Sequence, residues 1–168
     1  MDFESLVADL DGVTIERNPS LVKQKSRDFF WYSPVLKRQL DTVTADIVVT
    51  PKSEDEVIRI LKTCYELDVP VTVRGCGTGN YGQAMPLSGG VILNMAEMNR
   101  IIDIKTGRLT CEPGAIIHDI DEAARADSGQ EMRMHPSTAK TASIGGFIGG
   151  GSGGVGPARA GGVRDAGD

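Results

Sequence analysis

The chain has 168 residues, of which 40% are hydrophobic and 24% are charged. This is an ordinary globular composition, and it excludes a coiled coil, a disulfide-dense miniprotein and a disordered tail. The 18 basic and 23 acidic residues give a net charge of −5. No basic stretch is present that would follow a phosphate backbone, so nucleic acid is not an expected partner.

Membrane insertion and disulfide bonding are not expected either. No apolar run reaches the length of about 18 residues that a membrane span needs, and the acidic start lacks the apolar region of a signal peptide. Cys64, Cys76 and Cys111 are odd in number and include no CxxC pair, so neither a disulfide framework nor a metal site is predicted. We therefore expect a cytoplasmic protein that binds no metal.

Residues 1–40 are predicted to form a partly helical N-terminal extension. A short helix is expected around residues 4–10, and a helical or irregular stretch over residues 21–40. This second stretch contains four of the chain's eight aromatic residues: Phe29, Phe30, Trp31 and Tyr32. The favoured interpretation is that they pack the extension onto the rest of the domain, and the alternative is that they stack on a ligand or form an interface.

Residues 41–105 are predicted to form a first subdomain that starts with a strand, a helix and a second strand. An apolar run at 47–49 precedes Ser53, which can cap a helix, and Glu56 completes a capping box. Pro70 prevents continuation of the helix, and residues 71–73 read as the next strand. The residues expected on the inner face of the helix are Val57, Leu61 and Cys64, with Ile58 and Tyr65 beside them.

Three further strands and a second helix follow. Strands are predicted at 91–93, 101–104 and 108–111, and the last two form a hairpin that turns at Thr106-Gly107. A second subdomain is placed over residues 106–168. Its helix is expected to end at Ser128-Gly129. The apolar face of that helix comprises Ile116, Ile117, Ile120, Ala123 and Ala124.

The segment 74–83 is the first that carries chemistry. Gly77, Gly79 and Gly82 match G-x-G-x-x-G, but Pro86 and Gly89 follow too closely for the helix that a Rossmann fingerprint requires. Several glycines without a Cβ allow consecutive backbone N–H groups to converge on an anion, for which a diphosphate is the natural ligand. From spacing alone, an ordinary structural turn is an equal alternative.

Two side chains of this segment have open roles. Arg74, at the strand end, can serve either the phosphates or a structural carboxylate. Cys76 is interpreted as a small residue tolerated in a tight loop, with a reactive thiol as the lesser alternative.

The second informative segment begins at His135 and runs into an unusual density of glycine. Of the 21 glycines in the chain, 11 lie between Gly145 and Gly167. A flexible linker is the alternative, but apolar residues such as Ile144, Phe147 and Ile148 favour an ordered loop approached closely by backbone or by a flat ligand. His118 is interpreted as a solvated helix residue. His135, held extended by Pro136, is not expected to bind metal.

Together these segments resemble the FAD-binding domain of the vanillyl-alcohol oxidase type, also called PCMH-type. This family includes D-lactate dehydrogenase, D-2-hydroxyglutarate dehydrogenase and the glycolate oxidase flavin subunit. The resemblance runs from about Ala45 to the C-terminus. It consists of Val48-Val49-x-Pro51 with Glu56-Val57, Arg74-Gly75-x-Gly77-Thr78 with Gly82-Gln83, Glu112-Pro113-Gly114, Pro136-Ser137, Ser143-Ile144-Gly145-Gly146, and Gly154 with Gly162-x-Arg164-Asp165.

The resemblance implies an α+β fold of two subdomains with FAD between them. The loop would hold the pyrophosphate, and the later segments would run along the ribityl chain and the flavin. Family members that attach flavin covalently through this loop carry His where Thr78 stands, so non-covalent FAD is implied. The residues assigned to FAD in this way are Arg74, Gly75, Cys76, Gly77, Thr78, Gly79, Asn80, Gly82, Gln83, Pro113, Gly114, Pro136, Ser137, Thr138, Ser143, Ile144, Gly145, Gly146, Ile148, Gly153 and Gly154.

The implied function is that of a flavin-dependent oxidoreductase acting on a small 2-hydroxy acid. Family members continue beyond the position of Asp168, so we expect a fragment with an incomplete second subdomain, no substrate domain and no assignable catalytic residue. The chain by itself is not expected to turn over. The alternatives are a non-catalytic FAD-binding or electron-transfer module acting with a partner chain and, less favoured, a phosphate- or nucleotide-binding regulatory domain.

Overall fold

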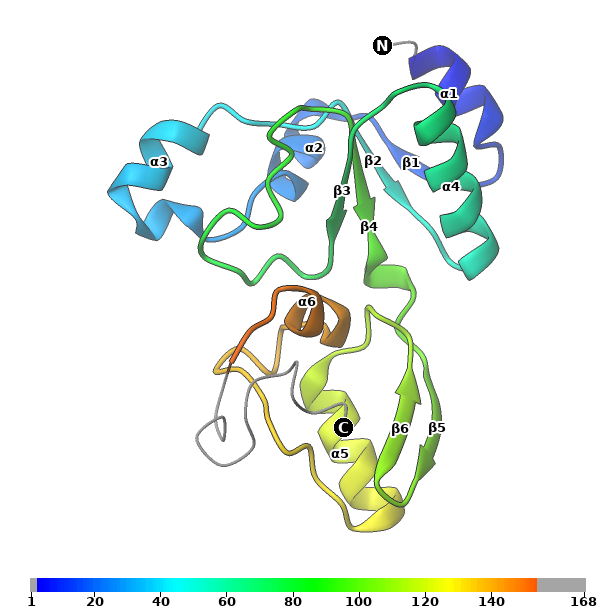
Figure 1. Cartoon of the computed structure of the whole chain (residues 1–168), viewed down its shortest axis with the longest axis vertical. Helices are drawn as coiled ribbons and strands as arrows, with labels where there is room; N and C mark the ends of the chain where they lie inside the picture. Colours follow the sequence, from blue (N-terminus) through cyan, green and yellow to red (C-terminus); the bar gives the residue numbers. More distant parts are fainter. Residues whose placement is uncertain (1–2, 154–168) are drawn as a thin grey trace. The chain divides into compact units, whose positions relative to one another are not determined.

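The computed structural model describes residues 3–153, which form two compact units that divide after Glu97. Figure 1 shows the helices and strands of both units. Strand β4 (Val91–Asn94) and the short helix η2 (Met95–Glu97) end the first unit, and strand β5 (Ile101–Lys105) opens the second. The boundaries expected from the sequence, after residues 40 and 105, do not coincide with this division after Glu97.

The first unit is built on a four-stranded sheet with the order β1-β2-β4-β3. Strands β2 (Ile47–Thr50) and β3 (Val71–Arg74) both pair with β4 in parallel, in registers that place Val48 and Thr72 opposite Ile92. Strand β1 (Thr14–Glu16) pairs antiparallel with β2. The sequence predicted the three parallel strands, but not β1, which is too short to show an alternating pattern.

Helix α4 (Glu54–Glu66) connects β2 to β3, as the sequence predicted. The Ser53 hydroxyl accepts a hydrogen bond from the Glu56 N–H at 3.3 Å. The Glu56 carboxylate accepts one from the N–H of Lys52 at 2.7 Å, and not from that of the cap residue itself. The capping box is therefore displaced by one residue on its return side.

The predicted inner face of α4 is wrong in part. The buried residues are Ile60, Thr63 and Cys64, with Val57 partly buried. Leu61, Ile58 and Tyr65 are exposed, and Tyr65 retains 88% of its accessible surface. Because apolar residues lie on more than one side of this helix, its own pattern did not reveal which side meets the sheet.

The N-terminal residues belong to the first unit and contribute to its core. The helices here are α1 (Phe3–Asp9), α2 (Pro19–Lys25), η1 (Phe30–Tyr32) and α3 (Pro34–Leu40). The α2 and α3 helices are capped by Asn18 and Ser33, whose side chains accept backbone N–H groups. The main core cluster consists of Leu6, Leu10, Val13, Ile47, Val49, Ile60, Cys64, Val69, Val91 and Leu93.

The second unit contains a hairpin and two helices. Strand β5 pairs with β6 (Arg108–Cys111), and Gly107 turns the hairpin with a φ of +72°. Helix α5 (Ile117–Ser128) ends at Gly129, which has the left-handed conformation that the sequence predicted for its stop. The hydrophobic core of the second unit includes Ile117, Ala142 and Phe147.

Helix α6 (Ile144–Gly149) corrects the expectation of a loop over the glycine-rich segment. The segment is ordered, but as a short helix, because Phe147 is buried against Ile117 and Ala142 and outweighs the low helix propensity of its glycines. Within residues 3–153, no helix combines the length and apolar character needed to cross a bilayer.

Candidate functional site

The predicted anion-binding segment follows β3 as a glycine loop, defined here as residues 75–83. It contains no helix, and Gly77 and Gly82 have φ angles of +68° and +79°. In the described part of the chain, the backbone N–H groups of residues 76–80 donate to no other protein group. A nest requires donors that are free of protein partners, and the convergence of these five N–H groups on an anion stays a prediction.

Arg74 lies beneath the glycine loop and is 8% exposed. Its Nη1 donates to the carbonyl oxygen of Arg27 at 2.6 Å, and its Nε is buried and has no partner among residues 3–153. A Cβ on Gly77 would overlap its guanidinium, so the loop backbone packs directly on the charged group. Burial lowers the pKa of Arg74 below its ordinary value, while the nearby charges of Asp28 and Cys76 oppose that change.

A segment that the sequence analysis did not assign to the site supports the loop. The Asp28 carboxylate accepts the N–H of Phe30 at 2.8 Å and that of Gly82 at 2.9 Å. The N–H of Phe29 donates to the carbonyl oxygen of Gly79 at 2.8 Å. The only hint in the sequence was an acidic residue next to an aromatic run, because Gly82, the partner of Asp28 in the loop, lies 54 residues away.

The aromatic cluster divides between the two interpretations considered for it. Phe30 is fully buried and packs the N-terminal segment, with the Arg27 guanidinium 5.0 Å from its ring centroid. Phe29, Trp31 and Tyr32 are exposed and contact one another, with the Trp31 and Tyr32 ring centroids 4.1 Å apart. The packing interpretation is therefore confirmed for Phe30 and is wrong for the other three.

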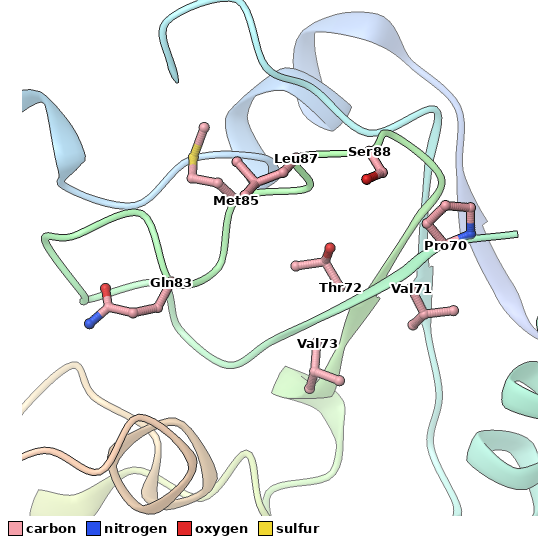
Figure 2. A pocket seen from close by; sticks show the side chains of 8 residues that line it. All are labelled: Pro70, Val71, Thr72, Val73, Gln83, Met85, Leu87 and Ser88. Carbon is pink, nitrogen blue, oxygen red and sulfur yellow. The ribbon is translucent and has the colours of Figure 1, made fainter. Parts of the chain in front are cut away.

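A cavity of about 490 Å³ lies beside the glycine loop. Figure 2 shows its lining side chains, which come from the edge strand β3 and from the connection to β4. Gln83 belongs both to the cavity and to the loop, where its Oε1 accepts the N–H of Tyr81 at 3.1 Å. The lining residues are Pro70, Val71, Thr72, Val73, Gln83, Met85, Leu87 and Ser88.

In the second unit, the fold joins two predicted segments that are thirty residues apart. The N–H of Gly145 donates to the carbonyl oxygen of Pro113 at 2.8 Å, and that of Ile144 donates to Ala115 at 2.9 Å. A Cβ on Gly145 would lie 2.6 Å from the Cβ of Pro113. Gly145 thus allows the start of α6 to touch the turn at residues 113–114.

Glu112 anchors that turn. Its carboxylate accepts hydrogen bonds from the backbone N–H of Arg100 at 2.8 Å and from the Arg100 guanidinium at 2.7 Å. These bonds hold the pKa of Glu112 below its ordinary value of about 4.5, and the bond from the Arg100 guanidinium has a larger effect than the bond from the Arg100 backbone. The Glu112 side chain is 8% exposed, so a buried carboxylate fixes the position of Pro113 and Gly114.

The predicted segment at residues 136–138 forms a turn against α5. The carbonyl oxygen of Thr138 accepts the N–H groups of Thr141 and Ala142, and those of Ile117 and His118 donate to Ala142 and Ala139. The turn therefore satisfies the first two N–H groups of α5, and Ser137 remains exposed.

Ser143 follows this turn and is 2% exposed, and its hydroxyl has no partner. A Cβ added at Gly146 would lie 3.1 Å from that hydroxyl oxygen.

The remaining predicted residues contribute less to these arrangements. Ile148 and Gly153 are exposed, and Gly154 lies outside the described residues. His118 is partly exposed with its Nε2 3.5 Å from Glu122, in keeping with a solvated histidine. Among residues 3–153, no group of His, Cys, Asp and Glu could hold a metal ion.

The residues present fit a large anionic cofactor with a diphosphate. The glycine loop offers five free N–H donors above a buried guanidinium whose Nε has no partner. In the second unit, the buried Ser143 hydroxyl is a further unpaired group, beside Gly146. Buried polar atoms usually have partners, but Asn94 Oδ1, outside the predicted binding segments, is also unpaired among the described residues, so a ligand bond at Arg74 or Ser143 stays a prediction.

The family model for the FAD binding domain matches residues 45–166. The chain belongs to this family. It is 38% identical over 122 residues to the glycolate oxidase subunit GlcD of Bacillus subtilis, covering 71% of this chain and 26% of that protein. It is 36% identical over 110 residues to a D-lactate dehydrogenase of Archaeoglobus fulgidus, covering 65% and 24%. This FAD-binding chain therefore spans about a quarter of the length of these relatives.

Solved structures confirm the α+β, PCMH-type fold of the FAD-binding chain. An alkyldihydroxyacetonephosphate synthase superposes with a TM-score of 0.83 at 16% identity, covering 98% of this chain and 32% of that one. A p-cresol methylhydroxylase gives a TM-score of 0.69 at 18% identity, covering 87% and 29%. FAD as the cofactor, which the family resemblance implied, is confirmed by the family match.

Proposed function

We propose that the chain holds FAD non-covalently and serves a flavin-dependent oxidoreductase that dehydrogenates a small 2-hydroxy acid. The observation that carries the proposal is the glycine loop, with free N–H groups at residues 76–80 over the buried Arg74. Thr78 offers no imidazole for attachment of the flavin at this position. The bound flavin supplies the hydride acceptor.

The roles of the individual residues remain part of this proposal. In the first unit, the N–H groups of the glycine loop bind the diphosphate. The positive charge of the Arg74 guanidinium stabilises the negative charge of the diphosphate. The cavity beside β3 takes the part of the dinucleotide next to the diphosphate, with Val71 and Met85 as apolar walls. In the second unit, residues 136–138 and 143–146 bind the ribityl and flavin portion. The Ser143 hydroxyl forms a hydrogen bond with this portion.

The substrate class rests on the relatives, which are a glycolate oxidase subunit and a D-lactate dehydrogenase. Both names specify small 2-hydroxy acids. We assign no residue of this chain to proton abstraction, and we propose that substrate binding requires a longer chain or a partner chain. A cytoplasmic location, expected from cysteines that are all free, belongs to the same proposal.

The test is reconstitution of the purified chain with FAD. We expect the visible absorption of oxidised flavin to remain with the protein through desalting and to be released into the filtrate after denaturation. Flavin that stays attached to denatured protein would contradict non-covalent binding, and a chain that takes up no FAD would overturn the proposal.

The substrate class is tested on the flavin-loaded chain under anaerobic conditions. We expect glycolate or D-lactate to bleach the flavin absorption when a longer chain, or a partner chain that supplies substrate binding, is present. If no 2-hydroxy acid bleaches it in any combination, the non-catalytic FAD-binding module becomes the better description.

A further inference from the structure

The segment at residues 26–30 is fixed in place independently of the glycine loop. Ser26 is fully buried, and its hydroxyl donates to the carbonyl oxygen of Val22 at 2.8 Å and accepts the N–H of Ala45 at 2.9 Å. Phe30, at the other end, is also fully buried. Asp28 therefore sits on a support held to α2 and to the residues before β2.

Three hydrogen bonds join this support to the loop region. Arg74 Nη1 donates to the Arg27 carbonyl oxygen, the N–H of Phe29 donates to Gly79, and the N–H of Gly82 donates to Asp28 Oδ2. Together they fix Arg74, Gly79 and Gly82, at the start, middle and end of the region. Residues 76–80 contribute only one carbonyl to these bonds, and their N–H groups remain free.

Asp28 is the charged member of this arrangement. It is 5% exposed, and its two carboxylate oxygens each accept a backbone N–H, one from Phe30 and one from Gly82. Its charge also acts on the guanidinium of Arg74, which is buried and otherwise bonded to a carbonyl oxygen. The charge of Asp28 favours a cation at Arg74, although the two side chains form no ion pair among the described residues, so the direct hold of Asp28 on the loop is its hydrogen bond with Gly82.

We infer that Asp28 is a positioning residue for the diphosphate of FAD, acting through Gly82 and Arg74. Its carboxylate holds the glycine loop in the conformation that leaves the N–H groups of residues 76–80 to the ligand. The inference rests on the proposed function, and it extends the site to a segment that comes before the residues matched by the family model.

Asp28→Asn is the variant that tests this role. Asparagine has one carbonyl oxygen, so it accepts from Phe30 or from Gly82 but not from both, and it carries no charge for Arg74. We expect the dissociation constant for FAD to rise about ten- to hundredfold, the range for losing a hydrogen bond to a charged group. The dissociation constant is measured by flavin fluorescence, at a temperature well below the unfolding temperature of each variant.

Amide hydrogen exchange without FAD separates positioning from a general structural role. We expect the Gly82 amide to exchange about tenfold faster in Asp28→Asn, with the amides of β4 unchanged. Asp103→Asn is the matched control, because Asp103 pairs with Lys105 in the hairpin of the second unit and belongs neither to the support nor to the glycine loop. It is expected to leave both measurements at their wild-type values.

The outcomes that overturn the inference are distinct from failure of the proposed function. Unchanged FAD affinity in a folded Asp28→Asn, or exchange that accelerates uniformly through the sheet, would show that Asp28 does not position the loop. If Asp28→Asn does not fold, Asp28→Glu, which keeps the charge but displaces the carboxylate, is judged by the same criteria. A wild-type chain that binds no FAD would refute the proposed function, while the exchange measurement would still decide whether Asp28 holds the loop.

Discussion

The two units use glycine for different physical reasons. In the glycine loop, Gly77 has a φ of +68° and lies on the Arg74 guanidinium, so both its conformation and its lack of a side chain are required. In α6, Gly145 is not in the left-handed region, and it is required only because a Cβ would meet Pro113. One region needs glycine to leave backbone donors free, and the other needs it to bring two segments into contact.

The largest effect is expected at Gly77. Gly77→Ala places a Cβ against the buried guanidinium and also imposes a left-handed conformation that costs about 1–2 kcal/mol outside glycine. We expect loss of measurable FAD binding, with flavin fluorescence as the measurement.

Gly107→Ala is the matched control for the conformational cost. Gly107 also has a positive φ, of +72°, but among the described residues nothing lies within 4 Å of a Cβ placed there, and it belongs to the hairpin of the second unit. We expect an FAD affinity within a few-fold of wild type. Equal losses of affinity in the two variants would show that the loss at Gly77 does not come from its contact with Arg74.

Gly145→Ala tests the contact that joins the second unit. The Cβ would lie 2.6 Å from the Pro113 Cβ and 2.8 Å from the Pro113 carbonyl oxygen, and overpacking of this kind costs about 1–3 kcal/mol. We expect a lower free energy of unfolding, measured with denaturant. A neutral result would mean that α6 does not depend on its contact with the turn.

The pH dependence of stability tests the anchor of the same turn. The folded-state pKa of Glu112 is depressed by Arg100, so its stabilisation is complete above the ordinary value of about 4.5 and is lost as the pH falls through the folded-state value. Glu112→Gln should therefore lower the melting temperature at neutral pH and flatten its decline in acid. The exposed Glu122→Gln serves as control, and identical acid profiles for wild type and Glu112→Gln would contradict the anchoring role.

The smallest effect is expected at Gly149, the last residue of α6. No atom of residues 3–153 lies within 4 Å of a Cβ placed there, so Gly149→Ala removes backbone entropy from the unfolded chain without a clash in that part of the structure. We expect stabilisation of up to about 1 kcal/mol, measured by thermal unfolding. Destabilisation would show that the glycines of α6 are required individually as well as at Gly145.

Most elements of the fold were predictable because their signals are local. Ser53, Pro70, Gly107 and Gly129 mark starts, stops and turns through the backbone of their immediate neighbours. The glycine loop was likewise predicted without a helix. The exposed side of α4 and the short strand β1 were missed, because burial against a distant partner decides both.

The sequence by itself determined the main strands and helices between residues 47 and 129, the FAD-binding family and the segments that carry the binding motifs, since each of these depends on residues close together in the chain. The tertiary structure alone decided that Arg74 bonds to Arg27, that Asp28 holds Gly82, and that Gly145 meets Pro113. These pairs are separated by about thirty to fifty residues, and hydrogen bonds and steric contacts between them exist only after the chain has folded.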